Sequence, residues 1–104
     1  MSDPSVATDS EVLRLRSSGQ GFARISRELG LEGAVQAHEA FRRAVGRLPA
    51  DEQDRVRREE SSRLDRLAAQ VNADTTTSSE DRARRLAVID RLRAWTLEDA
   101  DGDR

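Results

Sequence analysis

The stretch that decides the fold is GQGFARISRELGLEGAVQAHEAFRRAV, residues 19–45. Apolar side chains recur there at intervals of three and four residues on both sides of Gly30, which is the pattern of two amphipathic helices. Glycine takes the left-handed conformation that ends a helix, and Leu31 directly after it can pack into the core. The stretch therefore predicts two short helices, at about residues 21–29 and 33–46, joined by a tight turn.

Helices are also predicted on both sides of this stretch. Ser10 can cap a first helix that ends at the glycine of SSG, and acidic residues after Pro49 favour a fourth helix that extends to about Ala73. The segment NADTTTSS, residues 72–79, interrupts the pattern before a fifth helix over residues 80–97. The expected fold class is all-α: a three-helix helix-turn-helix unit followed by a two-helix antiparallel hairpin.

Four segments are expected along the chain. Residues 1–9 are polar and contain Pro4, so we expect a flexible tail, because nothing there offsets the entropy of ordering. Residues 10–48 form the helix-turn-helix unit. Residues 49–98 form the hairpin, which serves packing and oligomerisation, and residues 99–104 form an acidic tail.

The candidate core is small. Only 36% of the 104 residues are apolar and 3% are aromatic, so a single copy has little surface to bury. We therefore expect the apolar stripes of the hairpin to pack between copies as well as within one, with either Val88 or Trp95 completing the buried face of the fifth helix. The candidate oligomerisation residues are Leu64, Leu67, Val71, Leu86, Ile89, Leu92 and Trp95.

Composition limits the class of function. The chain has no cysteine, which removes thiolate chemistry, and its single histidine, His38, has no second ligand of that kind to complete a metal site. No phosphate-binding loop or Ser/His/Asp set is recognisable, so we expect no enzyme activity, no cofactor and no metal. No signal peptide or membrane-spanning run is present, and a cytoplasmic protein without membrane contact is expected.

Basic charge is concentrated around the helical break. The formal net charge is −2, yet residues 11–48 hold seven arginines against four glutamates. Such an excess favours contact with DNA phosphates. The candidate DNA-binding residues are Arg24 and Arg27, expected at phosphates, and Gln36, His38, Arg42 and Arg43, expected to face the DNA. The alternative for each is a solvated face on which Arg and Glu pair one turn apart.

Three segments resemble a known family. The order LRLRSSGQGFARISRELGL, then RREESSRLDRL, then RLAVIDRLRAWTLED is similar to small phage and actinobacterial DNA-binding proteins of the terminase small-subunit type. The complete absence of lysine is typical of the GC-rich genomes in which such proteins occur. The resemblance implies recognition of a DNA packaging site, a ring-forming homo-oligomer and a large terminase subunit as partner.

The leading hypothesis is a small protein that binds double-stranded DNA through a helix-turn-helix. One alternative is a helix-turn-helix transcription regulator, which is a dimer on a palindromic operator. The other is a helical protein-protein interaction module that binds no nucleic acid, favoured by the nearly neutral Arg/Glu helices of residues 49–98.

Overall fold

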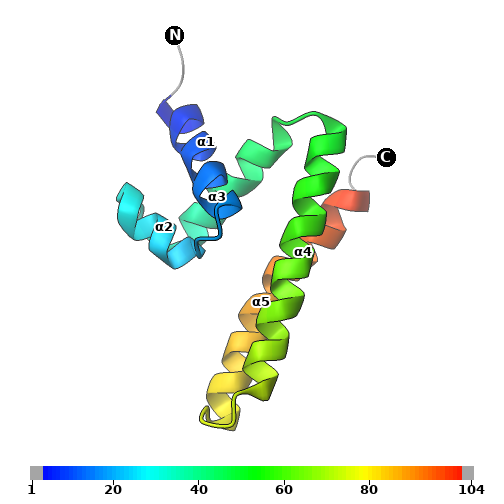
Figure 1. The fold of residues 1–104 in the computed structure, drawn as a ribbon. Helices are drawn as coiled ribbons and strands as arrows, with labels where there is room; N and C mark the ends of the chain where they lie inside the picture. Colours follow the sequence, from blue (N-terminus) through cyan, green and yellow to red (C-terminus); the bar gives the residue numbers. More distant parts are fainter. Residues whose placement is uncertain (1–3, 102–104) are drawn as a thin grey trace. The chain divides into compact units, whose positions relative to one another are not determined.

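The computed structural model describes residues 4–101, with side chains described for residues 5–96. Over this range the chain forms five helices and no strand, so the all-α prediction is confirmed (Figure 1). None of the described helices is long and apolar enough to cross a membrane. The chain divides into two compact units, residues 1–53 and 54–104.

The first unit contains three helices, called here the three-helix unit: α1 (Pro4–Ser17), α2 (Phe22–Leu29) and α3 (Ala34–Gly46). The bounds of α2 and α3 agree with the predicted ranges to within one residue. Both α1 and α2 pack against α3, and they also contact each other.

The predicted start of the first helix is wrong. We expected a flexible tail as far as residue 9, whereas α1 already begins at Pro4, a residue that fits the first turn of a helix because its missing N–H has no partner there in any case. Residues 1–3 lie outside the described range. The polar Asp9 is buried and accepts hydrogen bonds from Arg43 and Arg47 at the end of α3, and these bonds offset the entropy of ordering this segment.

The core of the three-helix unit is built from alanine, branched aliphatic and aromatic side chains. Phe22 and Phe41 meet edge to face, with ring centroids 5.5 Å apart, at the crossing of α2 and α3. At the start of α3, Ala34 is exposed. The buried apolar residues of the unit are Val12, Leu15, Phe22, Ile25, Ala37, Ala40, Phe41, Ala44 and Val45.

The turn between α2 and α3 depends on Gly30. Its φ of 68° lies in the left-handed region, and its N–H donates to the carbonyl of Ser26. The N–H of Leu31 donates to the same carbonyl at 2.8 Å, which closes the end of the helix. The Ser26 hydroxyl donates back to the Ala23 carbonyl, so this buried polar side chain is satisfied within its own helix.

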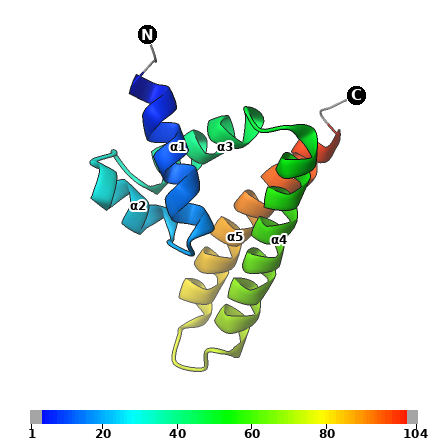
Figure 2. The same ribbon diagram turned by 45° about the horizontal axis from the view of Figure 1, so that its top comes forward.

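The two remaining helices, called here the helix pair, are α4 (Ala50–Ala73) and α5 (Ser79–Asp101). They lie side by side and run in opposite directions in both views (Figures 1 and 2). Ser78 caps α5 by accepting the N–H of Asp81 at 3.2 Å. Because α5 continues to Asp101, the expected acidic tail is helical at residues 99–101, and residues 102–104 lie outside the described range.

The helix pair buries only part of its predicted apolar stripe. Leu64, Ile89 and Trp95 are buried, so Trp95 rather than Val88 completes the inner face of α5. Leu86, Leu92 and Val71 are partly covered, whereas Leu67 and Val88 are exposed. Glu60 is buried as well, which its place in a highly charged run did not indicate.

Candidate nucleic-acid interface

The outer face of α3 is open along most of the helix. Val35 is 65% exposed, although it is a large apolar residue, and Glu39 and Arg42 follow it on the same side at one-turn intervals. Gln36 and His38 flank this row and are half-buried. The predicted division of α3 into an inner and an outer side is therefore confirmed in its main lines.

One edge of this face borders α2. The His38 ring meets Phe22 edge to face at 5.2 Å between centroids and stacks near Phe41 at 6.5 Å. On the other side of Phe22, the guanidinium of Arg16 lies 4.0 Å from the ring centroid, a cation–π contact. These contacts hold the imidazole in an aromatic cluster at the margin of the face, where one side of the ring packs inward.

Two arginines of α2 stand beside this edge. Arg24 forms an exposed ion pair with Glu28 at 3.1 Å, one turn away on the same helix. Arg27 is exposed and forms no ion pair within residues 5–96. On α3, Arg42 is likewise exposed and forms no ion pair within residues 5–96. Surface pairs such as Arg24–Glu28 are weak, so its guanidinium can be redirected to another anion at small cost.

The opposite edge of the face borders α1. Gln36, Glu39, Ala40 and Arg43 of α3 line an open cavity of about 350 Å³ together with Leu31 and Ser5, Thr8 and Asp9 of α1. Arg43 donates from Nε and from Nη2 to the two carboxylate oxygens of Asp9, each at 3.0 Å. Arg47 donates from Nη1 to the same carboxylate at 2.8 Å.

Asp9 is ionised because of these two arginines. Burial acts to raise the pKa of its carboxyl, but the hydrogen bonds and charges of Arg43 and Arg47 outweigh it and hold the pKa below the ordinary 3.8. The same contact raises the pKa of Arg43. The Asp9 carboxylate is therefore held in place by hydrogen bonds from the guanidinium groups of Arg43 and Arg47.

The six candidate DNA-binding residues thus fall into two kinds. Five of them, Arg24, Arg27, Gln36, His38 and Arg42, lie on α2 or on the outer face and margins of α3. Arg43 instead uses two of its donors on Asp9. Asp9 and Arg47 were not predicted as site residues, because their ion pair joins residues 38 positions apart and leaves no local signal.

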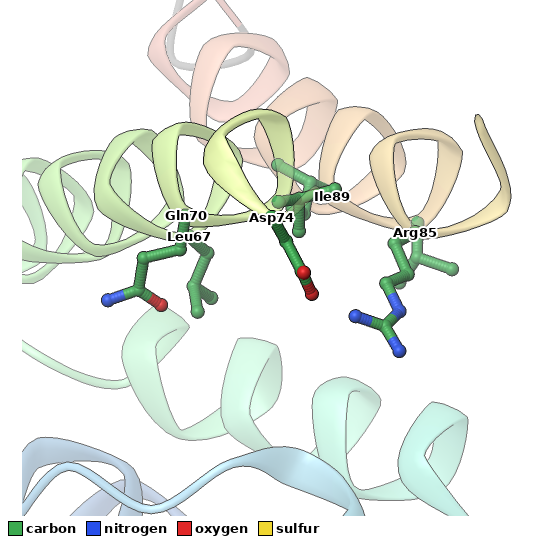
Figure 3. Close-up of a pocket in the computed structure, with 7 residues that line it drawn as sticks. Leu67, Gln70, Asp74, Arg85 and Ile89 are labelled. Carbon is green, nitrogen blue, oxygen red and sulfur yellow. The ribbon is translucent and has the colours of Figure 1, made fainter. Parts of the chain in front are cut away.

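A second surface feature lies on the helix pair. An open, largely apolar cavity of about 520 Å³ is lined by Leu67, Gln70, Val71, Asp74, Arg85, Val88 and Ile89 (Figure 3). Leu67 is 38% and Val88 46% exposed, so part of the predicted oligomerisation stripe lies open. In Figure 3 the labelled side chains of Leu67, Gln70, Asp74 and Arg85 extend to the same side of the two helices.

Asp74 closes the loop beside this cavity. Its carboxylate accepts hydrogen bonds from the hydroxyls of Thr76 and Thr77 and from the Thr76 N–H, and these bonds, together with the nearby charge of Arg85, lower its pKa to about 2. A threonine-rich segment that reads as a simple interruption of helical pattern is therefore an ordered loop at ordinary pH.

Within the part of the chain that the structure describes, no group of three or more His, Cys, Asp or Glu residues is arranged to hold a metal ion. Comparison of the chain with family models, with curated proteins and with solved structures found no match.

Proposed function

We propose that the protein binds duplex DNA through the three-helix unit, with α2, the turn at Gly30 and α3 acting as a helix-turn-helix. The observation that carries this proposal is the outer face of α3, which stays open while its inner face is locked onto α1 and α2. A rigid helix with a free face suits the major groove of B-DNA, which is about 12 Å wide and admits one helix.

The side chains on this face match the chemistry of base edges. The exposed Val35 can contact the methyl group of thymine, and the amide of Gln36 can pair with adenine. Arg42 is a donor for guanine or for a phosphate, and Arg24 and Arg27 on α2 are phosphate contacts. His38, tied to Phe22, is a positioned donor at the margin of the groove.

The helix starts support the same proposal. Gly21 precedes α2 and Gly33 precedes α3, and neither residue has a side chain that could cap the first turn. The N–H groups of both first turns therefore receive no cap from the preceding residue and can donate to an acceptor from outside the chain, and a backbone phosphate is one that DNA supplies.

The direct test is fluorescence anisotropy with labelled duplexes of random sequence at 50 and 200 mM salt. We expect binding that weakens steeply with salt, because phosphate contacts release counterions. The variant Arg27→Gln/Arg42→Gln should bind more weakly, while Arg66→Gln/Arg91→Gln on α4 and α5 removes two exposed arginines without an ion pair in the described range and serves as the matched control. Absence of salt-sensitive binding to any duplex at high micromolar protein would remove the proposal.

The biological role that we attach to this binding is recognition of a phage packaging site, on the strength of the resemblance to terminase small subunits. That role requires a ring of copies and a large terminase subunit as partner. A transcription regulator, the alternative role, is a dimer on a palindromic operator. Mass measurement in solution with and without DNA separates the two, because a ring is heavier than a dimer.

A second candidate function, protein-protein interaction through the helix pair, is favoured by the exposed apolar cavity around Leu67 and Val88. If copies associate there, Leu67→Glu/Val88→Glu should reduce the mass measured by sedimentation. Val35→Glu places a charge at an exposed valine elsewhere and should leave that mass unchanged. Association that survives both changes excludes this face.

A further inference from the structure

The cluster of Asp9, Arg43 and Arg47 has more hydrogen-bond donors than its carboxylate uses. Arg43 donates to Asp9 from Nε and Nη2, so its Nη1 group has no bond to Asp9. Arg47 donates only from Nη1, so its Nε and Nη2 groups have no bond to Asp9. The carboxylate is buried, whereas the side chains of Arg43 and Arg47 are 52% and 44% exposed. The remaining donors are thus within reach of a ligand from solvent.

The Asp9 carboxylate is the one acid in ion-pair contact with the two guanidinium groups within the described residues. Glu39, one turn before Arg43, is near enough for its charge to help raise the pKa of Arg43, but it forms no ion pair with either arginine in the described part of the chain. A phosphate diester carries one negative charge and accepts several hydrogen bonds, which is what the unused donors require.

The cluster lies on one edge of α3, and α2 borders the other edge. Arg24 and Arg27 belong to α2, which contacts α3 where His38 meets Phe22. Arg43 and Arg47 lie on the other edge, where α3 borders α1. A helix in the major groove has a phosphate backbone on each side, so arginines on both edges can contact both strands.

We propose that Arg43 and Arg47, held in place by Asp9, form a binding site for a backbone phosphate of DNA on the α1 edge of α3. This inference rests on the proposed DNA binding and adds Arg47 and Asp9 to the interface. Arg43 and Arg47 are phosphate contacts, and Asp9 is a positioning residue that fixes both guanidinium planes.

The first test uses Arg47→Gln, because Asp9 then keeps its two bonds to Arg43. Anisotropy titrations over a range of salt concentrations give the slope of log K against log salt, whose magnitude decreases by about 0.9 for each phosphate that the protein no longer neutralises. We expect that decrease, and from the same slope an about eight-fold weaker binding at 0.1 M salt. Arg55→Gln, 56% exposed on α4, removes the same charge outside the interface and should leave the slope unchanged.

The second test removes the proposed phosphate contact of Arg43 without a change in the net charge of the protein. Asp9→Asn/Arg43→Gln leaves the net charge of the protein as it is and leaves no buried carboxylate without a partner. Circular dichroism confirms the fold, and the magnitude of the slope should still decrease by about 0.9. An unchanged slope in this variant and in Arg47→Gln overturns the proposal, and so does an equal decrease of the magnitude in Arg55→Gln.

The outcomes also separate this inference from the proposed function. Wild-type protein that binds no duplex removes both. Wild-type binding that depends on Arg27 and Arg42 but not on Arg47 removes only the phosphate site on the α1 edge. A third arm uses inorganic phosphate at constant ionic strength: thermal stabilisation that Arg47→Gln abolishes, with DNA binding unaltered, assigns the site to free phosphate and overturns the proposal.

Discussion

The three-helix unit and the helix pair differ in the interactions that stabilise them. In the three-helix unit short helices pack on a shared apolar core, and the buried carboxylate of Asp9 in α1 forms ion pairs at the C-terminal end of α3. In the helix pair nearly half of the residues of two longer helices are charged, and ion pairs such as Arg55–Glu59 lie on the surface. We therefore expect the three-helix unit to be the more stable of the two, because burial of apolar surface contributes more than exposed ion pairs.

The largest effect should come from truncating the aromatic core. Phe41→Ala removes a buried ring that packs on Phe22, and such changes cost about 3 to 5 kcal/mol of unfolding free energy. Leu67→Ala in the helix pair should cost about 1 kcal/mol or less, because that side chain is partly in water already. Urea denaturation followed by circular dichroism measures both variants.

The two regions can be followed separately in that experiment. The only tryptophan of the chain, Trp95, lies in the second unit, so its fluorescence reports on the helix pair. In Phe41→Ala we expect helical signal to disappear at lower urea while Trp95 fluorescence changes less. Equal costs for Phe41→Ala and Leu67→Ala would contradict the difference drawn between the two regions.

A smaller effect is expected from Asp9→Asn, and it should depend on pH. The pKa of Asp9 in the folded protein is below 3.8, so its ion pairs stabilise the fold above that pH and stop doing so as the pH falls through the folded pKa. We expect Asp9→Asn to cost about 1 to 2 kcal/mol at pH 7, discounted because both arginines are half exposed.

Urea denaturation at pH 7 and at pH 2.5 measures this dependence. The difference between wild type and Asp9→Asn should shrink at the lower pH. Asp90→Asn, whose partner Arg93 lies at 3.7 Å on the surface of α5, is the control and should show little difference at either pH. A difference in unfolding free energy between wild type and Asp9→Asn that stays constant with pH would contradict this prediction.

Two glycines of the three-helix unit should respond with opposite signs. A Cβ at Gly30 or at Gly46 meets no atom within 4 Å, so space does not distinguish them. Gly30 has a φ of 68°, and Gly30→Ala should cost about 1 kcal/mol. Gly46 is helical, and Gly46→Ala should stabilise by about 0.5 to 1 kcal/mol. Thermal denaturation decides, and a loss of equal size at both positions would show that conformation is not the cause.

The smallest effect belongs to the ion pair between the two helices of the pair. Arg93 of α5 donates to Asp65 of α4 at 2.9 Å, and the Asp65 side chain is largely exposed. A double-mutant cycle with Arg93→Gln and Asp65→Asn should give a coupling of about 0.2 to 1 kcal/mol that decreases in 1 M salt. A coupling above about 2 kcal/mol, insensitive to salt, contradicts the assignment of this pair as a surface interaction.

The helix ends were predictable where local signals mark them. Gly30, Gly33 and Pro49 punctuate the chain, so α2, α3 and the start of α4 agree with the prediction to within one residue. The start of α1 was not predictable from its neighbours. Arg43 and Arg47, whose bonds to Asp9 stabilise this segment, lie 34 and 38 positions further along the chain. A polar segment with no partner nearby in the sequence is therefore predicted as a flexible tail.

In the candidate site, too, features with a local sequence signal were predictable and features that depend on distant residues were not. Periodicity separated the inner from the outer side of α3, because burial follows helical spacing. Periodicity does not reveal which exposed arginine finds a partner on another helix, so Arg43 was grouped with Arg42 although only Arg43 reaches Asp9. Burial of Glu60 and Arg16 was missed for the same reason, since charged residues are rarely buried and the contacts that cover them are tertiary.

The distance along the chain between Asp9 and its partners has a consequence for synthesis. A polypeptide leaves the ribosome from its N-terminus, so α1 emerges well before Arg43 and Arg47. Until those residues clear the exit tunnel, the carboxylate lacks both guanidinium partners and the apolar side of α1 can contact α2 but not α3. The nascent three-helix unit therefore completes its packing late, when its third helix arrives.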